Sequence, residues 1–163
     1  MKILFWIVFI GLLIQAGALL TTYCMSLFNP EVSKDLYLGL DLFALQEWST
    51  YQYTNHVSFL AAFLLIKAYI AYLVITVFSK INLNSPFSEV VSEHLSKISY
   101  VALTAGFLAI IAQGHTKWLA KSGMELSQDW GSGEFLFLAG IIFIMAQVFK
   151  KGIELQTENE LTI

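Results

Sequence analysis

Two uninterrupted apolar stretches constrain this chain more than any other feature. Residues 3–20 contain one strongly polar side chain, Gln15, and residues 57–78 contain one charged side chain, Lys67. A helix needs about 20 predominantly apolar residues to cross the hydrocarbon core of a bilayer, so both stretches are long enough to span it. Hydrophobic residues make up 57% of the chain and charged residues 13%, which excludes an ordinary soluble domain and a disordered chain. The sequence therefore predicts an integral membrane protein.

Two later apolar stretches, 98–112 and 135–149, are shorter, but their flanking residues extend each of them to the length of a span. We therefore predict an all-α membrane protein that forms a single domain over residues 1–163. Its four expected spans are residues 3–25, 55–79, 95–114 and 132–151. The remaining segments are 29–54 and 115–131, which we expect outside the membrane, and a cytoplasmic tail over 152–163.

The first apolar stretch has features of a cleaved signal peptide, because Lys2 precedes it and the small residues 16–18 lie near its end. The apolar character continues beyond these residues to Leu27 and Phe28. This continuation favours a helix that is retained, and we expect four spans rather than three.

Four spans place both termini on the same side of the membrane. With the termini in the cytoplasm, the inner lysines are Lys2, Lys80, Lys97, Lys150 and Lys151, and the outer ones are Lys34, Lys117 and Lys121. Because lysines are enriched in cytoplasmic loops, this distribution favours cytoplasmic termini. The same orientation places five aromatic residues at the outer interface, where tryptophan and tyrosine commonly gather. They are Trp48, Tyr51, Tyr53, Trp118 and Trp130.

The first outer segment contains a short alternating pattern. Leu36, Leu38, Leu40 and Leu42 are separated by single residues, a period typical of a strand with one buried face. An isolated strand is not stable, so the second outer segment, with Met124 and Leu126, is its natural partner. A small β cap is one interpretation of this pattern. A loop or an interfacial helix is the other.

The inner connection predicts the start of a helix. Ser85 followed by Pro86 suits an N-cap and a first helical position. Apolar residues then recur at helical spacing, while Glu93 and Lys97 lie four residues apart in the favourable order for an ion pair. We expect an amphipathic segment at the cytoplasmic surface that continues into the third span. It is either a docking surface or a lead-in that rests on lipid.

Lys67 is the most unusual residue of the chain. It lies about 16 Å from either end of its span at 1.5 Å per residue, which is too far for easy snorkelling. A lysine at this depth costs about 2.5–3.5 kcal/mol on insertion scales, so it should face the bundle interior or water. We identify Lys67 as a candidate ligand or switch site. The alternative is a structural lysine that bonds to water and to polar groups of neighbouring helices.

Other polar groups suggest little chemistry. Cys24, His56 and His115 fall near the outer ends of three helices, but their spacing specifies no metal, so we expect neither a metal site nor a cofactor. No Ser-His-Asp set, glycine-rich phosphate loop or His-Glu-x-x-His motif occurs, so we expect no enzyme. The chain contains no arginine, which argues against direct nucleic-acid binding. Ala102 and Gly106, four residues apart, predict a close helix-packing face.

The inner connection and the tail carry a family resemblance. Residues 84–89 form an Asn-Ser-Pro-Phe-Ser-Glu start, and Val90, Leu95 and Ile98 follow it at helical spacing. Residues 149–163 begin with Phe-Lys-Lys-Gly and end with Glu-Asn-Glu-Leu-Thr-Ile. Both motifs resemble those of the small multi-pass bacterial membrane proteins called domain of unknown function 2975. The resemblance implies a bacterial inner-membrane protein without an established activity, and a cytoplasmic helix-turn-helix regulator as its partner.

These features together predict a non-enzymatic membrane protein that senses a signal or sequesters a cytoplasmic regulator. The expected docking residues lie in the inner connection and the tail: Phe87, Glu89, Glu93, Glu158, Leu161 and Ile163. The tail residues 161–163 suit the addition of a strand to the partner. The alternative function is a small transporter subunit or an immunity-type membrane protein with an anionic-ligand site at Lys67. Besides the lipid bilayer, a second copy of the chain is a further candidate partner.

Overall fold

The computed structural model describes residues 2–81, 88–124, 126 and 128–160. Within these residues, the long helices are α1 (Lys2–Ser26), α3 (Thr50–Lys80), α4 (Glu89–Lys121) and α5 (Ser132–Glu160). Each of the four is long and apolar enough to cross a bilayer. The prediction of an all-α membrane protein with four spanning helices is therefore confirmed, and each expected span lies within one of these helices.

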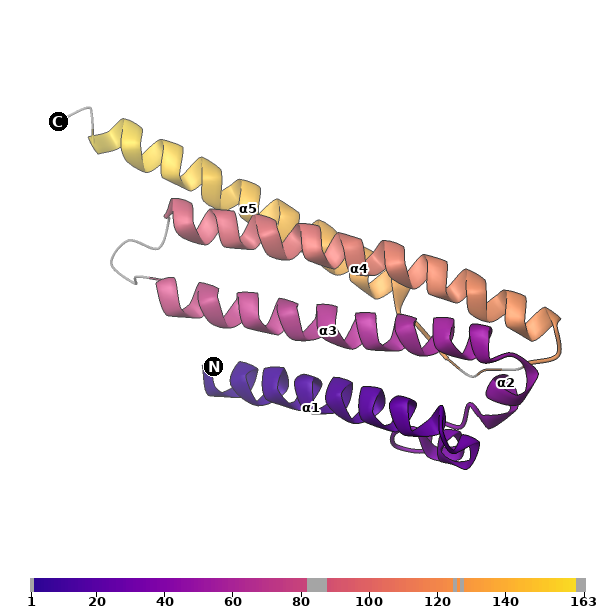
Figure 1. Cartoon of the computed structure of the whole chain (residues 1–163). Helices are drawn as coiled ribbons and strands as arrows, with labels where there is room; N and C mark the ends of the chain where they lie inside the picture. The colour runs from indigo at the N-terminus through magenta and orange to yellow at the C-terminus, as the bar shows by residue number, and fades with distance from the viewer. Residues whose placement is uncertain (1, 82–87, 125, 127, 161–163) are drawn as a thin grey trace.

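The four helices form a row rather than a closed bundle (Figure 1). α3 and α4 pack together at the centre, α1 packs against α3, and α5 packs against α4, while the described backbones of α1 and α5 stay apart. The start of α1 and the end of α5 lie at the same end of the molecule, which we call the termini end. The long connections fold at the opposite end, which we call the cap end.

α4 and α5 approach each other closely through small residues. Ala102 and Gly106 are buried, and a Cβ atom on Gly106 would lie 2.7 Å from Cδ2 of Leu136 on α5. The Ser99 hydroxyl donates a hydrogen bond of 2.9 Å to the carbonyl oxygen of Ala139. Small residues let helix backbones approach each other in membranes. The predicted packing face of Ala102 and Gly106 is therefore confirmed, with α5 as its partner.

α1 is held against α3 near both of its ends. At the cap end, the Ser26 and Tyr53 hydroxyls share a buried hydrogen bond of 2.6 Å. Towards the termini end, the rings of Phe5 and Phe78 lie 5.7 Å apart between centroids. The pairing of α1 with α3 thus combines a specific polar contact with aromatic packing.

The first long connection folds into helical turns instead of a strand. A 3₁₀ helix, η1, covers Pro30–Asp35, and a short helix, α2, covers Phe43–Trp48. Between them the chain reverses at Leu38 and Gly39, whose φ angles are 50° and 81°. The Asp35 carboxylate accepts the Gly39 N–H at 2.9 Å and stabilises this reversal. The strand interpretation is wrong because two left-handed residues interrupt the alternating pattern, and the loop-and-helix interpretation describes the segment.

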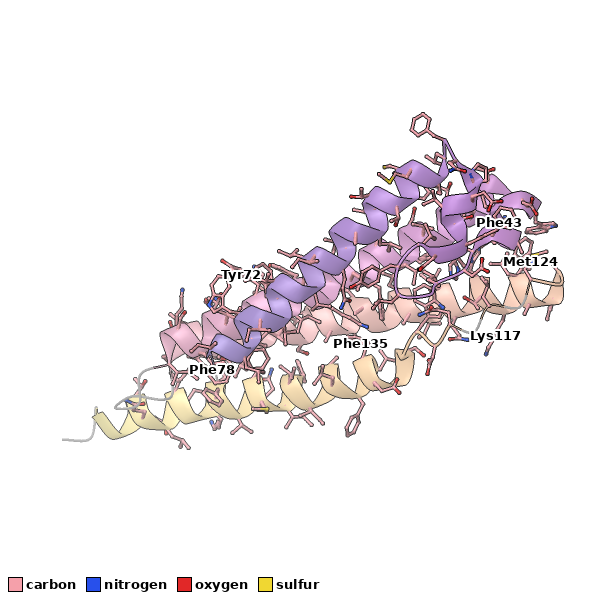
Figure 2. All side chains as sticks on the ribbon, turned by 90° about the horizontal axis from the view of Figure 1, so that it is seen from below. Phe43, Tyr72, Phe78, Lys117, Met124 and Phe135 are labelled. Carbon is pink, nitrogen blue, oxygen red and sulfur yellow. The ribbon has the colours of Figure 1, made fainter. Side chains whose placement is uncertain are left out.

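Two of the alternating leucines nevertheless belong to the core of the folded connections at the cap end, which we call the cap. Leu36 and Leu42 are buried, whereas Leu38, at the reversal, is 84% exposed. The buried pair belongs to a cluster against which Met124 and Leu126 of the second connection pack (Figure 2). The two connections therefore contact each other as expected, but through packed side chains and not through paired strands.

The five aromatic residues expected at one interface all belong to the cap end, but two of them are not on the surface. Trp48 and Trp118 are 44% and 48% exposed with ring centroids 6.2 Å apart, and Tyr51 is 72% exposed. Trp130 and Tyr53 are buried, and each has its polar atom hydrogen-bonded inside the protein. Their assignment to an aromatic belt is wrong, because internal partners satisfy the groups that would otherwise seek the interface.

α4 begins later than its sequence motif predicts. Ser88 is the N-cap, and its hydroxyl accepts the Val91 N–H at 3.4 Å. The described helix therefore has Ser88 as its N-cap, whereas the predicted cap residues Ser85 and Pro86 lie outside the described part of the chain. Serine is a preferred N-cap residue at either position. Glu89, which follows Ser88 in the chain, adds a favourable negative charge to the first turn of α4.

From this cap, one continuous helix runs through the expected amphipathic segment and the third span. Val91, Leu95 and Ile98 are buried as their spacing indicates, and Ser92 joins them because its hydroxyl reaches the Ala146 carbonyl oxygen at 3.4 Å. α5 likewise continues beyond its expected span to Glu160, so the tail is helical over residues 152–160.

The close approach of α4 and α5 predicts that Gly106→Val destabilises the protein. The branched side chain would press on Leu136, and overpacking of this kind costs about 1–3 kcal/mol. We expect a lower midpoint of thermal unfolding in detergent, followed by circular dichroism. Gly114→Val is the matched control on the same helix, because a Cβ at Gly114 meets nothing within 4 Å. Equal midpoints for the two variants would contradict the packing role of Gly106.

Candidate functional site

One face of α3 carries a histidine, a phenylalanine and a lysine that line the cavities described below. His56, Phe63 and Lys67 are separated by seven and four residues, so they share one helical face. His56 lies near the cap, and Lys67 lies about three turns deeper in the row of helices. Two cavities lie between this face and the cap, and both are lined by Leu40 and Gln128. We call them the Lys67 cavity and the His56 cavity.

Lys67 has no anionic partner within the described residues. Its Nζ atom lies 4.8 Å from the ring centroid of Phe63 and 5.8 Å from that of Phe135. Contacts of a cation with an aromatic ring contribute about 0.5–2 kcal/mol, whereas a central lysine costs about 2.5–3.5 kcal/mol in a membrane helix. The two rings offset a substantial share of this cost, but they carry no net negative charge, so the ammonium group still attracts an anion.

The Lys67 cavity has a volume of about 160 Å³. Polar side chains from α1, from both connections and from α3 line it: Gln15, Tyr37, Lys67, Gln128 and Asp129. Asp129 is exposed, and its carboxylate already accepts the Gly131 N–H at 3.0 Å. The cavity thus offers one cation in its depth, amide groups beside it and one carboxylate towards the cap.

The His56 cavity has a volume of about 310 Å³ and is also lined by Asp41 and Gln128. His56 is fully buried, and neither of its ring nitrogens has a hydrogen-bond partner among the described residues. Buried polar side chains are almost always hydrogen-bonded, so this histidine is exceptional. A polar cavity of this size has room for water or for a polar ligand group beside the ring.

Aromatic side chains fix the position of His56. The Trp130 ring meets it edge-on with centroids 5.5 Å apart, and the Trp130 indole N–H donates to the Thr116 hydroxyl at 3.0 Å. His115 is a second ring neighbour of His56, with ring centroids 6.1 Å apart. His115 is itself held by Gln52, whose Oε1 lies 2.8 Å from Nε2 of the imidazole. The histidine is therefore embedded in a rigid cluster of rings.

The structure brings together two of the three residues that the sequence suggests as a metal or redox cluster. His56 and His115 are neighbours, whereas Cys24 is exposed on α1. Among the residues that the structure describes, no three histidine, cysteine or acidic side chains are grouped closely enough to hold a metal ion.

At the termini end, a groove of about 580 Å³ lies between the start of α4 and the end of α5. The predicted docking residues Glu89 and Glu93 both line it, together with Lys97, Lys150 and Glu154. The expected Glu93–Lys97 ion pair is not formed in the described structure; the Lys97 ammonium instead lies 5.8 Å from the ring centroid of Tyr69. We call this hollow the α4/α5 groove.

The other predicted docking residues are placed differently. Glu158 is exposed on the last turns of α5, beyond the groove. Phe87, Leu161 and Ile163 lie outside the described residues, so their part in docking stays a prediction.

Sequence reasoning did not identify His56 as a buried ring without a hydrogen-bond partner among the described residues. The spacing of eleven residues between His56 and Lys67 places both on one helical face, a signal that the sequence does contain. Asp41, Gln128 and Asp129 carry no comparable signal, because they lie in connections whose folding depends on contacts between distant segments.

A family model described as "Protein of unknown function (DUF2975)" matches residues 42–163. The chain belongs to this family. The resemblance of the inner connection and the tail to DUF2975 is thereby confirmed. No curated protein and no solved structure matches the chain.

The DUF2975 match includes His56, Lys67, Gln128 and the whole α4/α5 groove. α1 with Gln15 and the η1 turn lie outside the matched range. In this DUF2975 protein the cavities beneath the cap are therefore built from matched and unmatched segments together.

The unpartnered imidazole predicts an unusual effect on stability. A buried polar group without a partner costs about 1–3 kcal/mol, so His56→Leu should raise the free energy of unfolding by a similar amount. His115→Leu is the matched control, because it breaks the bond to Gln52 and should not stabilise. Unfolding of both DUF2975 variants in detergent micelles would be compared with that of the parent. A loss of stability in His56→Leu would show that the ring is satisfied after all.

Proposed function

We propose that this protein is a non-enzymatic sensor of the bacterial inner membrane, with both termini in the cytoplasm. In this proposal a small anionic molecule binds at Lys67, and the termini end presents the result to a cytoplasmic regulator. The observation that carries the proposal is Lys67 itself. It is a mid-span ammonium group that meets no anion in the described structure and that lines a cavity of mixed polar and apolar side chains beneath the cap. A charged side chain inside a membrane span is energetically costly, so such a residue is a candidate for a functional role.

The distribution of lysines supports the proposed orientation. Lys80, Lys97, Lys150 and Lys151 lie towards the termini end. Three lysines belong to the cap end: Lys34 lies in η1, and Lys117 and Lys121 lie in the last turns of α4. The larger number of lysines at the termini end favours its placement in the cytoplasm.

α3 offers a direct mechanical link between the two ends. It runs without interruption from the His56 and Lys67 face to a cluster at the termini end. In this cluster Leu73 and Val77 of α3 pack with Val91 and Leu95 of α4 and with Ala146 of α5. A small shift of α3 on ligand binding would repack this cluster and alter the α4/α5 groove, because packed helix interfaces move in discrete steps.

The α4/α5 groove is the surface that we propose for the regulator. Glu89, Glu93 and Glu154 place three carboxylates around it, and Lys97 and Lys150 add two ammonium groups. The family resemblance supplies the kind of partner, a small helix-turn-helix protein. The mixed charges suit a helical or extended segment whose own charges are complementary.

The lining of the cavities favours a sensor over the transporter alternative. Towards the cap, Lys67 has polar neighbours, but towards the termini end the hollow beside it is lined by apolar side chains. A path for a polar solute needs polar or hydrated walls along its whole length. The arrangement therefore suits a ligand that is held at Lys67 better than one that passes it.

The proposal predicts that partner binding depends on the termini end and not on Lys67. Crosslinked co-purification from native membranes would compare the full chain with a version ending at residue 149 and with Glu93→Lys. We expect both changes to reduce recovery of one cytoplasmic DNA-binding protein by about tenfold, equivalent to about 1.4 kcal/mol. Glu47→Lys, exposed at the cap end, is the matched control and should leave recovery unchanged. Lys67→Met should also retain the partner while losing the response to ligand.

The same partner set for the full chain and the shortened version would contradict docking at the groove and the tail. Loss of solute uptake in Lys67→Met, with no partner recovered from any version, would favour the transporter alternative.

A further inference from the structure

A second hollow meets the Lys67 cavity at Lys67 itself. It has a volume of about 360 Å³ and lies between α1 and α5, whose backbones stay apart. Phe5, Val8 and Leu12 of α1 form one wall, and Phe135 and Leu138 of α5 form the other. Figure 2 labels Phe135, which lies near the start of α5. Apart from Lys67, every lining residue is apolar, and we call this hollow the α1/α5 groove.

The α1/α5 groove runs from Lys67 towards the termini end. On α3 its floor extends from Lys67 to Val74, which corresponds to about 10 Å along the helix axis. Val8 and Leu138 on its walls are 42% and 39% exposed, so the groove is open along its side. In a membrane this open side faces the hydrocarbon of the lipids. An apolar chain can therefore enter the groove sideways, without crossing water.

The two hollows together describe one kind of ligand. The Lys67 cavity, at about 160 Å³, is smaller than the roughly 300–1,000 Å³ typical of small-molecule sites, so it accommodates a compact polar head rather than a whole molecule. The α1/α5 groove extends the same site with apolar walls. A ligand that fills both has a small head with one apolar chain attached.

Charge selects the head. The Lys67 ammonium favours an anion, and the amides of Gln15 and Gln128 supply N–H donors in the same cavity. Asp129 lines the cavity as well, and its negative charge opposes a head with a second negative charge. A monoanionic carboxylate meets both conditions, and the glycerophosphate head of a two-chain lipid is too large for the cavity.

We propose that the ligand is a long-chain fatty acid or a similar single-chain carboxylate, taken up from the bilayer. Its carboxylate binds the Lys67 ammonium group, and its chain lies in the α1/α5 groove against Phe135 and the α1 wall. This inference rests on the anion site of the proposed function and names its ligand class.

The test uses the full chain in nanodiscs of zwitterionic phosphatidylcholine. The probe is palmitic acid with a photoactivatable diazirine in its chain, and its methyl ester serves as the uncharged comparison. We expect the acid to label residues of the α1/α5 groove, with palmitate competing and hexanoate failing to compete. Labelling by the ester should be at least about tenfold lower, because it lacks the charge-assisted contact to Lys67.

Variants test separately how the protein binds the carboxylate head and the apolar chain of the ligand. Lys67→Gln should reduce labelling by the acid about tenfold. Val8→Trp should fill the groove and reduce labelling similarly, whereas Ile7→Trp is the matched control, because Ile7 is 66% exposed and does not line the groove. Size-exclusion profiles and thermal unfolding would confirm that each variant is folded.

The outcomes distinguish this inference from the function on which it rests. If hexanoate competes as well as palmitate and Lys67→Gln reduces labelling as expected, the anion site is supported and the long-chain ligand is overturned. If labelling ignores Lys67, both are overturned. Contacts between two protomers across the groove, with no labelling, would replace the fatty acid by a second copy of the chain. Bound palmitate that leaves the recovery of the cytoplasmic partner unchanged would overturn the sensor and keep the ligand.

Discussion

The hydrocarbon core of a bilayer offers no water to backbone N–H and C=O groups, and this constraint governs the rest of the structure. Each spanning segment must satisfy its own backbone, so all four are helices. Lipid also removes the hydrophobic drive that would pull helices together, which leaves close packing and internal polar contacts to hold them. Gly106 against Leu136 and the Ser26–Tyr53 hydrogen bond are the two forms that this takes here. Because α1 and α5 lack such contacts with each other, the row stays open between them.

The open row explains why polar groups gather where they do. Beneath the cap, the two connections close over the α3 face and supply Asp41, Gln128 and Asp129 from outside the spans. Further from the cap, no described connection covers the helices, and the walls beside Lys67 are apolar. Lys67 lies where these two environments meet. Its position, rather than its charge alone, is what makes an amphiphilic ligand a consistent occupant.

The spans were predictable from sequence because membrane thickness sets a length and a hydropathy that local residues must meet. Lys67 was predictable for the same reason, as an exception to that hydropathy. Features that depend on contacts between distant segments were not. In the alternation from Leu36 to Leu42, Leu36 and Leu42 are buried, but Leu38 is exposed because the chain turns back at Leu38 and Gly39, where the Asp35 carboxylate accepts the Gly39 N–H. Tryptophan is a residue type that commonly lies at membrane interfaces. Trp130 is buried instead, because its indole N–H donates a hydrogen bond to the Thr116 hydroxyl on α4. Ser85 and Ser88 are equal candidates as caps, and only the observed start of α4 decides between them.

His56 and Lys67 each disfavour the folded state in isolation, one as a buried imidazole without a partner and the other as a charge at mid-span. Either alone is explained by local solvation. Both on one face of α3, beneath one cap, require a common account. The two cavities share Gln128 and Leu40, which line both of them. Under the proposed function, a group bound at Lys67 would contact Leu40 and Gln128, which also line the cavity beside His56. The proposal thereby treats the two unfavourable residues as one site, in which a ligand at Lys67 alters the enclosure of His56 and α3 transmits that change to the termini end.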